Sequence, residues 1–342
     1  MPSRRDFLRS AGVLAAFTDT SWAQSSKLNV VVMLANSLPD LSLDSTIRAP
    51  HLTRFAQDSV QFERSYAACP ETGPSQASLI TGRFPFACGV THDGAPLPAD
   101  QPTITHALQA AGYQTAIVGD WLLGAVQKAD ETNLAIDFLK QNRRHPFFLL
   151  VAWHRSDAPV VDDDAGRILA AMDDLGMANN TIAMFTSDHG YGSGPLEPAM
   201  RIPLMIRYAR LKPEVRSGVL ASNVDLAPTL LALCGVSPGG SLQGRDLTRE
   251  QPQSIYGCGQ LGTPEEWRML VRGLDKLVVD RRQNVTHLYN LGADPLEMEN
   301  RARDSAFELK RDELKALLRD WMRRTGDGMD PSGLKRRAPA AR

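Results

Sequence analysis

This sequence of 342 residues has no long apolar run, few cysteines and almost no net charge. No stretch of about 18 or more apolar residues occurs, so the sequence predicts no membrane-spanning helix. The formal net charge is -1, which gives no electrostatic case for binding nucleic acid or an anionic membrane surface. Internal repeats and low-complexity segments are absent as well. The length therefore predicts one large globular domain, or a large domain with a smaller one.

The first residues resemble an address for export. The stretch "SRRDFLRSAGVLAAF" places Arg4 and Arg5 before Phe-Leu and a mildly apolar stretch, and Ala23 is a plausible end of the signal. This pattern resembles a twin-arginine export signal, whereas the simpler alternative is a basic first helix of the fold. We therefore expect a signal peptide over 1–23 and a mature protein that is periplasmic or secreted.

The four cysteines do not form a recognisable motif. Cys69, Cys88, Cys234 and Cys258 are widely spaced, and no Cys-x-x-Cys occurs. The periplasm permits disulfides, but the spacing fits no zinc site. The sequence predicts scattered buried thiols or one incidental bridge.

Strand-length apolar runs alternate with helical stretches over most of the chain. The stretches typical of strands are 28–35, 60–66, 114–120, 146–153, 181–190 and 202–209. The stretches typical of helices are 49–59, 72–82, 103–113, 131–142, 165–177 and 223–235. This alternation predicts an α/β fold, a mostly parallel sheet sandwiched by helices. The site of such a sheet lies beyond the carboxyl ends of its strands, where Asn36, Asp120, His154 and Asp188 would converge.

From about residue 252 the pattern changes to short strands separated by turns. The stretches 267–273, 275–282 and 286–291 predict a small antiparallel sheet, and 305–326 predicts a long, charged, amphipathic helix. After the signal peptide we therefore expect an α/β domain over 27–250, a C-terminal subdomain over 251–328 and a disordered tail over 329–342.

The stretch "TGPSQASLITGR", residues 72–83, predicts a tight turn that enters a short helix. Pro74 suits the first helical position and Gly82 suits the end. Thr72 stands beside the free N–H groups of the helix start, which attract anions. Thr72 is therefore either a nucleophile aimed at a bound anion or a helix cap, and the cap is the preferred interpretation because it needs no metal or partner.

The same stretch resembles the sulfatase signature, Cys-x-Pro-Ser-Arg-x-x-Leu-Leu-Thr-Gly-Arg. Other stretches agree in order, including "NVVVMLANSLPDL", "TIAMFTSDHG" and "HLYNLGADPLEMENRA". Nearly the whole mature chain is similar to the sulfatase family, nearest to its choline-sulfatase-like and arylsulfatase-like members, although 123–145 and the segment after 154 are shortened. The resemblance implies the alkaline-phosphatase-like α/β fold and a small anionic ester, a sulfate or a phosphate, as substrate or ligand.

The resemblance also implies a divalent metal, usually calcium, held by hard oxygen ligands. The paired aspartates of the first strand fall on Asn36 and Ser37, so two carboxylates are lost. Asp188 and His189 match the metal pair at the far end of the site, and Asp120, where the family has lysine, is a candidate replacement ligand. This set predicts a weak calcium site, a site that favours a softer ion such as zinc, or no metal.

The catalytic residues that the resemblance implies are largely replaced. The family makes its formylglycine nucleophile from the motif cysteine, and that position is Thr72, from which formylglycine cannot be made. Gln76 stands where the motif has arginine and keeps a hydrogen-bond donor, and His154 survives from a histidine-containing stretch. Each lost oxyanion-type donor removes roughly 3 kcal/mol of transition-state stabilisation, so the usual sulfate-ester chemistry is expected to be impaired.

Three functions remain open for a chain that is by descent a sulfuric ester hydrolase. The first is a hydrolase with a remodelled site, in which Thr72 attacks phosphate esters more than sulfate esters. The second is a non-catalytic pseudoenzyme that binds an anionic ligand or a partner protein. The third is an inert remnant. The substrate and the oligomeric state are not predicted.

Overall fold

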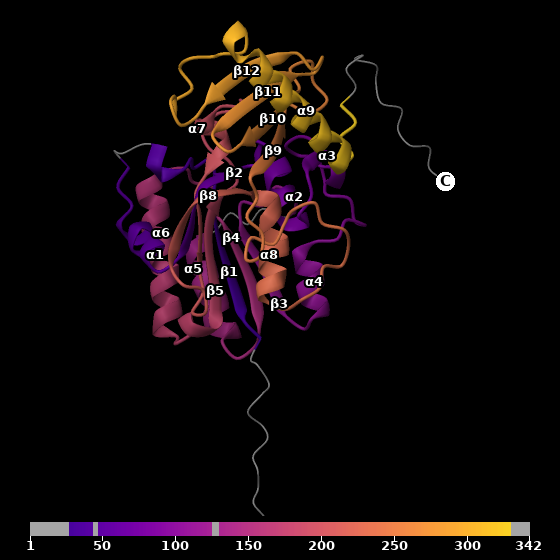
Figure 1. Ribbon diagram of the computed structural model, residues 1–342. Coiled ribbons are helices and arrows are strands. Elements are labelled where there is room, and N and C mark those ends of the chain that lie inside the picture. Colours follow the sequence, from indigo (N-terminus) through magenta and orange to yellow (C-terminus); the bar gives the residue numbers. More distant parts are fainter. Residues whose placement is uncertain (1–26, 44–46, 125–129, 330–342) are drawn as a thin grey trace, which may run out of the picture.

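A computed structural model describes residues 27–43, 47–124 and 130–329 of the chain (Figure 1). The expected signal peptide and residues 330–342 of the expected tail lie outside these ranges. Met329, where the tail was expected to begin, is buried in the core of the C-terminal subdomain. In the described ranges no helix has the length and apolarity needed to cross a membrane.

An eight-stranded sheet forms the centre of the larger part of the molecule. Its order is β3-β4-β1-β5-β7-β2-β6, and β8 also pairs with β2. β1 lies between β4 and β5 and is parallel to both, while β7 runs antiparallel to β5 and β2. The predicted mostly parallel sheet is confirmed. The strands are β1 (Asn29–Ala35), β2 (Val60–Tyr66), β3 (Gln114–Gly119), β4 (Phe147–Ala152), β5 (Thr181–Ser187), β6 (Arg201–Ile202), β7 (Leu204–Arg207) and β8 (Glu214–Ser222).

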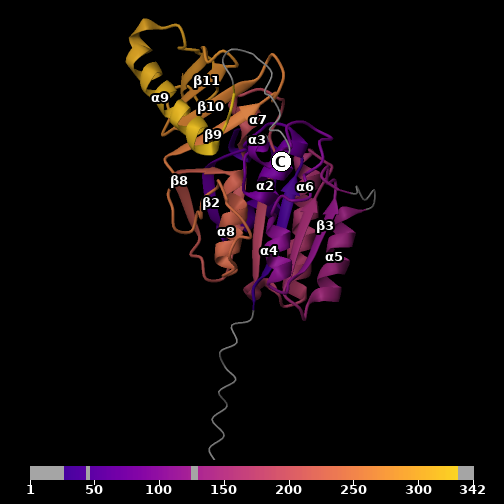
Figure 2. The same cartoon turned by 90° about the vertical axis from the view of Figure 1, so that its right-hand side faces the viewer.

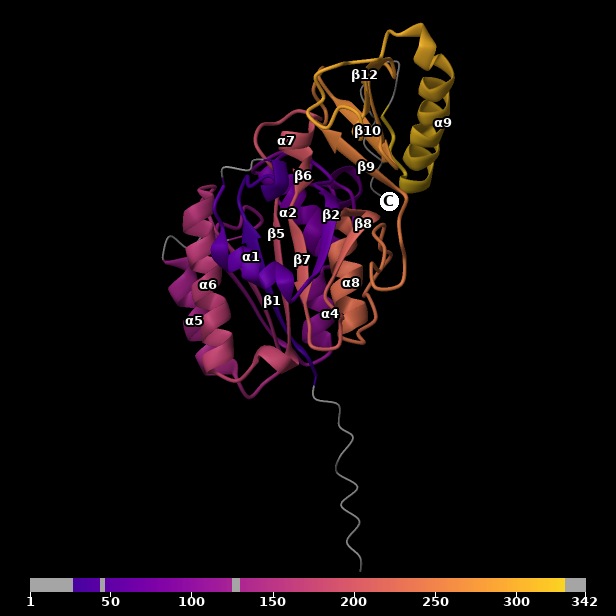
Figure 3. The ribbon, with the colours of Figure 1, turned by 60° about the vertical axis from the view of Figure 1, so that its left-hand side comes forward.

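Helices cover both faces of this sheet, and the layers separate clearly in Figures 2 and 3. One face carries α1 (Pro50–Gln57), α5 (Glu131–Asn142) and α6 (Ala158–Asp174). The other carries α2 (Thr72–Thr81), α4 (Ile104–Ala110) and α8 (Leu226–Leu233). Successive side chains of β1 alternate between the two apolar clusters, so the whole strand is buried.

The C-terminal subdomain is a four-stranded antiparallel sheet with one long helix packed on it (Figure 3). Its order is β12-β11-β10-β9, and α9 (Glu308–Thr325) buries Leu314, Leu318 and Trp321 in a core shared with the sheet. The predicted antiparallel sheet and helix are confirmed, while the edge strand β9 was not predicted. The strands are β9 (Ser254–Gly259), β10 (Trp267–Arg272), β11 (Asp275–Asp280) and β12 (Val285–Asn290).

Several boundaries differ from the sequence-based expectations for local reasons. The strand expected over 202–209 is divided into β6 and β7 at Pro203, which has no N–H to donate to a ladder. The helix expected over 165–177 begins earlier, at Ala158, because the Asp157 carboxylate accepts the N–H of Val160 and caps it. The short helices α3 (Pro85–Cys88) and α7 (Glu197–Met200) were not predicted.

A buried charged cluster joins the two sheets. Lys276 of β11 is fully buried and pairs with Glu197 of α7 at 3.0 Å and with Glu297 at 2.7 Å. The hydroxyl of Tyr66 in β2 donates to Glu197 at 3.2 Å, and the backbone N–H of Glu197 donates to Glu297 at 2.6 Å. We call these four residues the junction cluster.

Candidate active site

Four neighbouring strands deliver the predicted site residues to one edge of the sheet. Because β3, β4, β1 and β5 are adjacent and parallel, their carboxyl ends meet there. Asp120 follows β3, His154 follows β4, Asn36 and Ser37 follow β1, and Asp188 and His189 follow β5. The predicted convergence of these segments is confirmed at the level of the backbone.

Asp188 is the most deeply buried acid of this edge. It is 1% exposed, and its Oδ1 accepts the N–H of Ser37 at 2.8 Å and of His189 at 2.7 Å. Its Oδ2 has no partner at standard hydrogen-bond geometry. Burial raises the pKa of Asp188, although the charge of His189, the two N–H groups and the Thr72 hydroxyl oppose that shift. A buried carboxylate oxygen without a partner is costly, so this atom points to a missing ligand.

His189 presents one nitrogen to the centre of the site. Its Nδ1 lies 2.7 Å from the carbonyl oxygen of Gly190, and since a carbonyl only accepts, Nδ1 carries the hydrogen. In the neutral ring, Nε2 therefore has a free lone pair. Nε2 lies 3.2 Å from Oγ1 of Thr72, 3.4 Å from Oγ of Ser37 and 3.9 Å from Oδ2 of Asp188.

Gly190 explains how the histidine is held. A Cβ at this position would lie 2.0 Å from the carbonyl oxygen of Pro198, so only glycine allows the chain to pass so close to α7. The N–H of Gly190 also donates to the carbonyl of Ala199 at 2.8 Å. The short helix α7 thus fixes the loop that orients His189.

Thr72 does not cap the helix that it begins. The N-cap of α2 is Glu71, and Thr72 is the first helical residue. Pro74 is therefore the third helical residue and not the first, whereas Gly82 ends α2 as predicted, with a φ of 63°. The Thr72 hydroxyl faces His189, so the capping role favoured from the sequence is wrong.

The helix start is occupied by an acid that the sequence did not single out. Asp93 accepts the N–H of Gly73 at 2.7 Å through Oδ1. A carboxylate is favourable at a helix N-terminus, and there it stands where an anionic ligand would also bind. Glu71 lies close by, and its pKa is raised mainly by burial and further by the charge of Asp93.

Gln76 is used to fasten α2 to the end of β3. It is 2% exposed, its Nε2 donates to the carbonyl of Asp120 at 3.0 Å, and its Oε1 accepts the N–H of Leu122 at 2.9 Å. Asp120 meets Gln76 through its backbone. Its carboxylate does not join the Asp188 carboxylate and the His189 imidazole in a group whose ligand atoms lie within 4.8 Å of one another.

His154 is oriented by a partner that the sequence reasoning missed. Its Nδ1 is hydrogen-bonded to Oε1 of Glu131, the first residue of α5, which is 4% exposed. The histidine side chain itself is 55% exposed. No contact joins it to Thr72 or His189, so it forms a second, separate histidine–acid pair beyond β4.

The residues present fit a divalent ion at the Asp188–His189 pair. Oδ2 of Asp188 and Nε2 of His189, which otherwise contacts two hydroxyls, face each other across 3.9 Å, and Nδ1 is held by a carbonyl, as in metal-binding histidines. Asn36, half-buried beside Ser37, is the remaining predicted ligand on this edge. One carboxylate and one imidazole suit zinc or manganese better than calcium.

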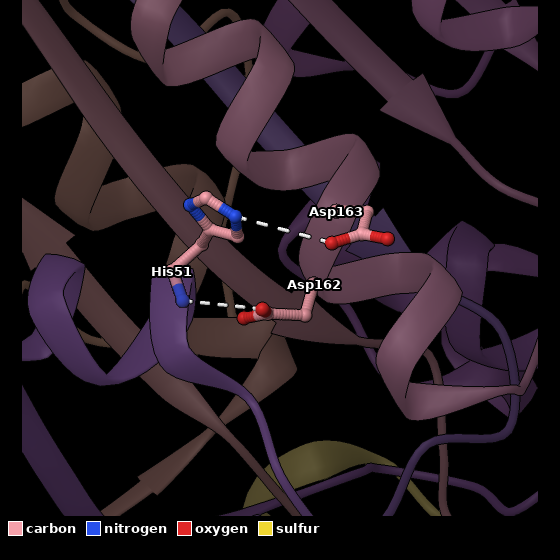
Figure 4. Close-up of side chains that lie close together, drawn as sticks. All are labelled: His51, Asp162 and Asp163. Atoms are coloured by element: carbon pink, nitrogen blue, oxygen red, sulfur yellow. Dashed lines mark hydrogen bonds and ion pairs between the residues drawn. The ribbon is translucent and has the colours of Figure 1, made fainter.

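A second group of potential ligands is a helix cap. In the ranges that the structure describes, His51, Asp162 and Asp163 bring three ligand atoms within 4.8 Å of one another (Figure 4). Both oxygens of Asp162 already accept N–H groups at the start of α1, from His51 at 3.1 Å and Leu52 at 2.7 Å. His51 and Asp163 are exposed and 3.9 Å apart. The group holds α1 against α6.

The fold and this edge define an α/β protein with a mostly parallel sheet and a buried Asp-His pair at the carboxyl ends of its strands. The chain belongs to the sulfatase family, whose model, described as Sulfatase, matches residues 28–143 and 160–236. The unmatched stretch 144–159 contains His154. Family members generally bind a divalent metal.

Curated relatives are similar at low identity. The N-acetylglucosamine-6-O-sulfatase of Bacteroides thetaiotaomicron is 20% identical, over 93% of this chain and 90% of that protein. The human N-acetylgalactosamine-6-sulfatase is 26% identical, over 61% of this chain and 62% of that protein. These relatives support the descent of the chain from sulfuric ester hydrolases.

Solved structures confirm the fold. One, in complex with its substrate D-glucosamine-2-N,6-O-disulfate, has a TM-score of 0.81 at 19% identity and covers 90% of this chain and 99% of its own. The phosphonate monoester hydrolase of Agrobacterium radiobacter has a TM-score of 0.76 at 16% identity and covers 87% and 96%. At these identities the likeness concerns the fold and not the substrate.

Proposed function

We propose that this protein is an exported, metal-dependent hydrolase of anionic sugar esters in which Thr72 has replaced the formylglycine nucleophile. The observation that carries the proposal is the 3.2 Å contact between Oγ1 of Thr72 and Nε2 of His189, beside the unpartnered Oδ2 of Asp188. A hydroxyl within hydrogen-bond reach of a base that a third group orients is the arrangement of an activated nucleophile. Here the orienting group is the carbonyl of Gly190.

The chemistry follows from these contacts. The Thr72 oxygen attacks the sulfur or phosphorus of the ester while its proton passes to Nε2 of His189, and the bond to the sugar oxygen breaks. The leaving oxygen takes that proton, and the charge of Asp188 stabilises the imidazolium in between. Water then hydrolyses the Thr72 ester. A divalent ion bound to Asp188 and to Nε2 of His189 would occupy the lone pair that otherwise takes the Thr72 proton. In the ion-loaded protein the ion would therefore take the place of the histidine as the group that acidifies the Thr72 hydroxyl, and it would polarise the ester.

The substrate class is supported by the family and by the residue that replaces the nucleophile. Two relatives act, by their names, on sulfated amino sugars. Thr72 cannot become formylglycine, and a threonine ester is released only by attack of water, which favours a phosphate ester as much as a sulfate ester. We therefore propose a sugar phosphate or sugar sulfate, met in the periplasm or outside the cell after twin-arginine export.

A second candidate is a non-catalytic protein that binds an anionic sugar. Three observations favour it. The carboxylate of Asp93 occupies the start of α2, Gln76 is tied to backbone groups, and the main charges that act on Asp188 and Glu71 come from histidines and acids. No lysine or arginine is among these main charges, so transition-state charge would be stabilised by the ion and helix start alone.

Turnover of p-nitrophenyl phosphate, p-nitrophenyl sulfate and glucosamine 6-sulfate by the zinc- or manganese-loaded protein separates the two candidates. We expect Thr72→Ala to lower kcat/KM at least 100-fold and Thr72→Ser to retain most of it, because serine keeps the hydroxyl. The control is Thr286→Ala, an exposed threonine of β12. Activity that survives Thr72→Ala would refute the nucleophile, and saturable binding without turnover would establish the second candidate.

A further inference from the structure

We propose that Cys69 and Cys258 are the two halves of a disulfide that fastens the segment before Thr72 to the C-terminal sheet. Both side chains are fully buried and belong to one small apolar cluster with Leu261, against which Phe86 packs. In the structure both are thiols. The proposal is independent of the role of Thr72, because it rests on the packing of two cysteines that the chemistry does not use.

The backbone already holds the two cysteines together. The N–H of Cys258 donates to the carbonyl of Ala68 at 2.9 Å, and its Sγ lies 3.5 Å from the same oxygen. Ala68 and Cys258 are 190 positions apart in the sequence, so this is a tertiary contact. The Cys69 and Cys258 thiols also lie in hydrogen-bonding contact. A disulfide requires two Cα atoms that lie close together, and the backbone hydrogen bond from Cys258 to the neighbour of Cys69 brings the two chain segments together.

The next residues repeat the same connection. Oε1 of Glu71 accepts the N–H of Gln260, the residue just after β9, at 3.1 Å. The same oxygen accepts a hydrogen bond from the thiol of Cys69, whose Sγ lies 3.9 Å away. The edge strand β9 is therefore fixed against the segment 67–71 by backbone, carboxylate and thiol contacts. A covalent bond between the two sulfurs would join elements that already pack against each other.

The other two cysteines have different partners. Sγ of Cys88 donates to the carbonyl of Pro85 at 3.6 Å. Cys234 interacts with the hydroxyl of Tyr113 and packs against the apolar cluster that contains that residue. Neither belongs to the cluster of Cys69, so both serve as internal controls.

The oxidant is a disulfide, either a thiol–disulfide oxidoreductase of the oxidising compartment or oxidised glutathione. One cysteine thiolate attacks that disulfide and releases one thiol, and the second thiolate then attacks the mixed disulfide and releases the other thiol. The two cysteines lose two electrons and two protons, and the oxidant gains them. Burial raises the pKa of the Cys69 thiol, so the exchange is slow in the folded protein and proceeds while β9 is undocked.

The test is to refold the purified chain in oxidised and reduced glutathione and to measure its intact mass and its unreduced peptide map. We expect the loss of two hydrogens and a linked pair of peptides that contain Cys69 and Cys258. We also expect the melting temperature to rise by roughly 5–10 °C over the reduced protein, because the bridge closes a loop of more than 100 residues.

Four variants sharpen the test. Cys69→Ala and Cys258→Ala should each abolish the mass change, whereas Cys88→Ala and Cys234→Ala should leave it intact. The wild-type peptide map needs no variant, so the test stands even if a substitution prevents folding. Four free thiols after oxidative refolding, or a bridge to Cys88 or Cys234, would overturn the proposal.

Discussion

Two buried polar clusters of this protein differ in how closely a cation approaches their carboxylate oxygens. In the junction cluster, the ammonium of Lys276 lies between Glu197 and Glu297, and the hydroxyl of Tyr66 and a backbone N–H satisfy further oxygens. Oε1 of Glu297 has no partner at hydrogen-bond geometry, but it lies 2.7 Å from that ammonium. At the carboxyl ends of β1 and β5, Asp188 and His189 are buried almost as deeply. Oδ2 of Asp188 also has no hydrogen-bond partner, and its ion-pair contact, with Nε2 of His189, is 3.9 Å long.

We infer from this difference that the junction cluster has a structural role and that the Asp188–His189 pair binds a ligand. Buried charges persist in structural roles when they are paired and hydrogen-bonded. A buried carboxylate oxygen with neither a hydrogen bond nor a close cation destabilises the fold by itself, so it is retained where something else binds to it. Four measurements test this contrast, from the largest expected effect to the smallest.

Removing the cation of the junction cluster should have the largest effect. Lys276→Met leaves two buried carboxylates without their shared cation, and we expect the free energy of unfolding to fall by about 3–5 kcal/mol. Urea unfolding measures the loss. Lys212→Met, at an exposed lysine, is the control and should stay within about 0.5 kcal/mol of wild type. An equally small change at Lys276 would show that the cluster does not support the fold.

A further buried carboxylate, that of Asp225, should make the stability of the protein depend on pH. Burial raises the pKa of Asp225 to about 6, although the N–H groups of Arg245 and Ser222 lower it. The folded state thus binds this proton more tightly than the unfolded state does, and the associated stability is present below about pH 4 and lost as the pH rises through 6.

We therefore expect the wild type to lose roughly 3 kcal/mol between pH 4 and 7 relative to Asp225→Asn, a variant with no titrating group there. The measurement is urea unfolding of both proteins at several pH values in this range. Parallel stability curves for the two proteins would contradict the raised pKa.

Substitution at the Asp188–His189 pair should stabilise the protein, whereas substitution in the junction cluster should destabilise it. In the presence of a chelator, Asp188→Asn should raise the free energy of unfolding by about 1 kcal/mol, since the amide nitrogen can donate where Oδ2 has no partner. With zinc or manganese at 100 times its dissociation constant, the wild type should gain about 2.7 kcal/mol and the variant much less. Thermal melts with and without the ion measure both effects. If no divalent ion stabilises the wild type, the proposed metal dependence is wrong.

The smallest expected effect concerns the acid at the start of α2. Asp93→Asn keeps an oxygen for the N–H of Gly73 but removes the negative charge, so inorganic phosphate and sulfate should bind about 3- to 10-fold more tightly. Calorimetric titration measures the affinity. Asp163→Asn, at an exposed acid of α6, is the matched control. Equal affinities for wild type and Asp93→Asn would show that Asp93 does not compete with anions.

Local patterns in the sequence were sufficient for much of the fold. The expected strand 60–66 and helix 131–142 coincide with β2 and α5, because alternation and helical periodicity were clear there. The strand β8 was not predicted, because its first five residues, from Glu214, are partly or fully exposed and show no apolar pattern. The parallel order β3-β4-β1-β5 was implied by the βα rhythm, and with it the edge at which the site lies.

The site was predicted in part. Thr72, Asp188 and His189 were singled out, and they meet; Gln76, Asp120 and His154 were singled out too, but their contacts lead elsewhere. Glu131 and Asp93 were missed because each acts on a residue about 20 positions away through one side-chain contact, which no periodicity encodes.

The sequence by itself determined the alternation of strands and helices, the family, and the replacement of the nucleophilic cysteine by Thr72, because these depend on local periodicity and on residue identity. Only the tertiary structure decided that the Thr72 hydroxyl faces His189 and does not cap α2, that Asp188 has an unpartnered oxygen, and that Cys69 meets Cys258. Contacts of this kind join positions more than a hundred residues apart, and they are fixed by the packing of the whole chain around its two sheets.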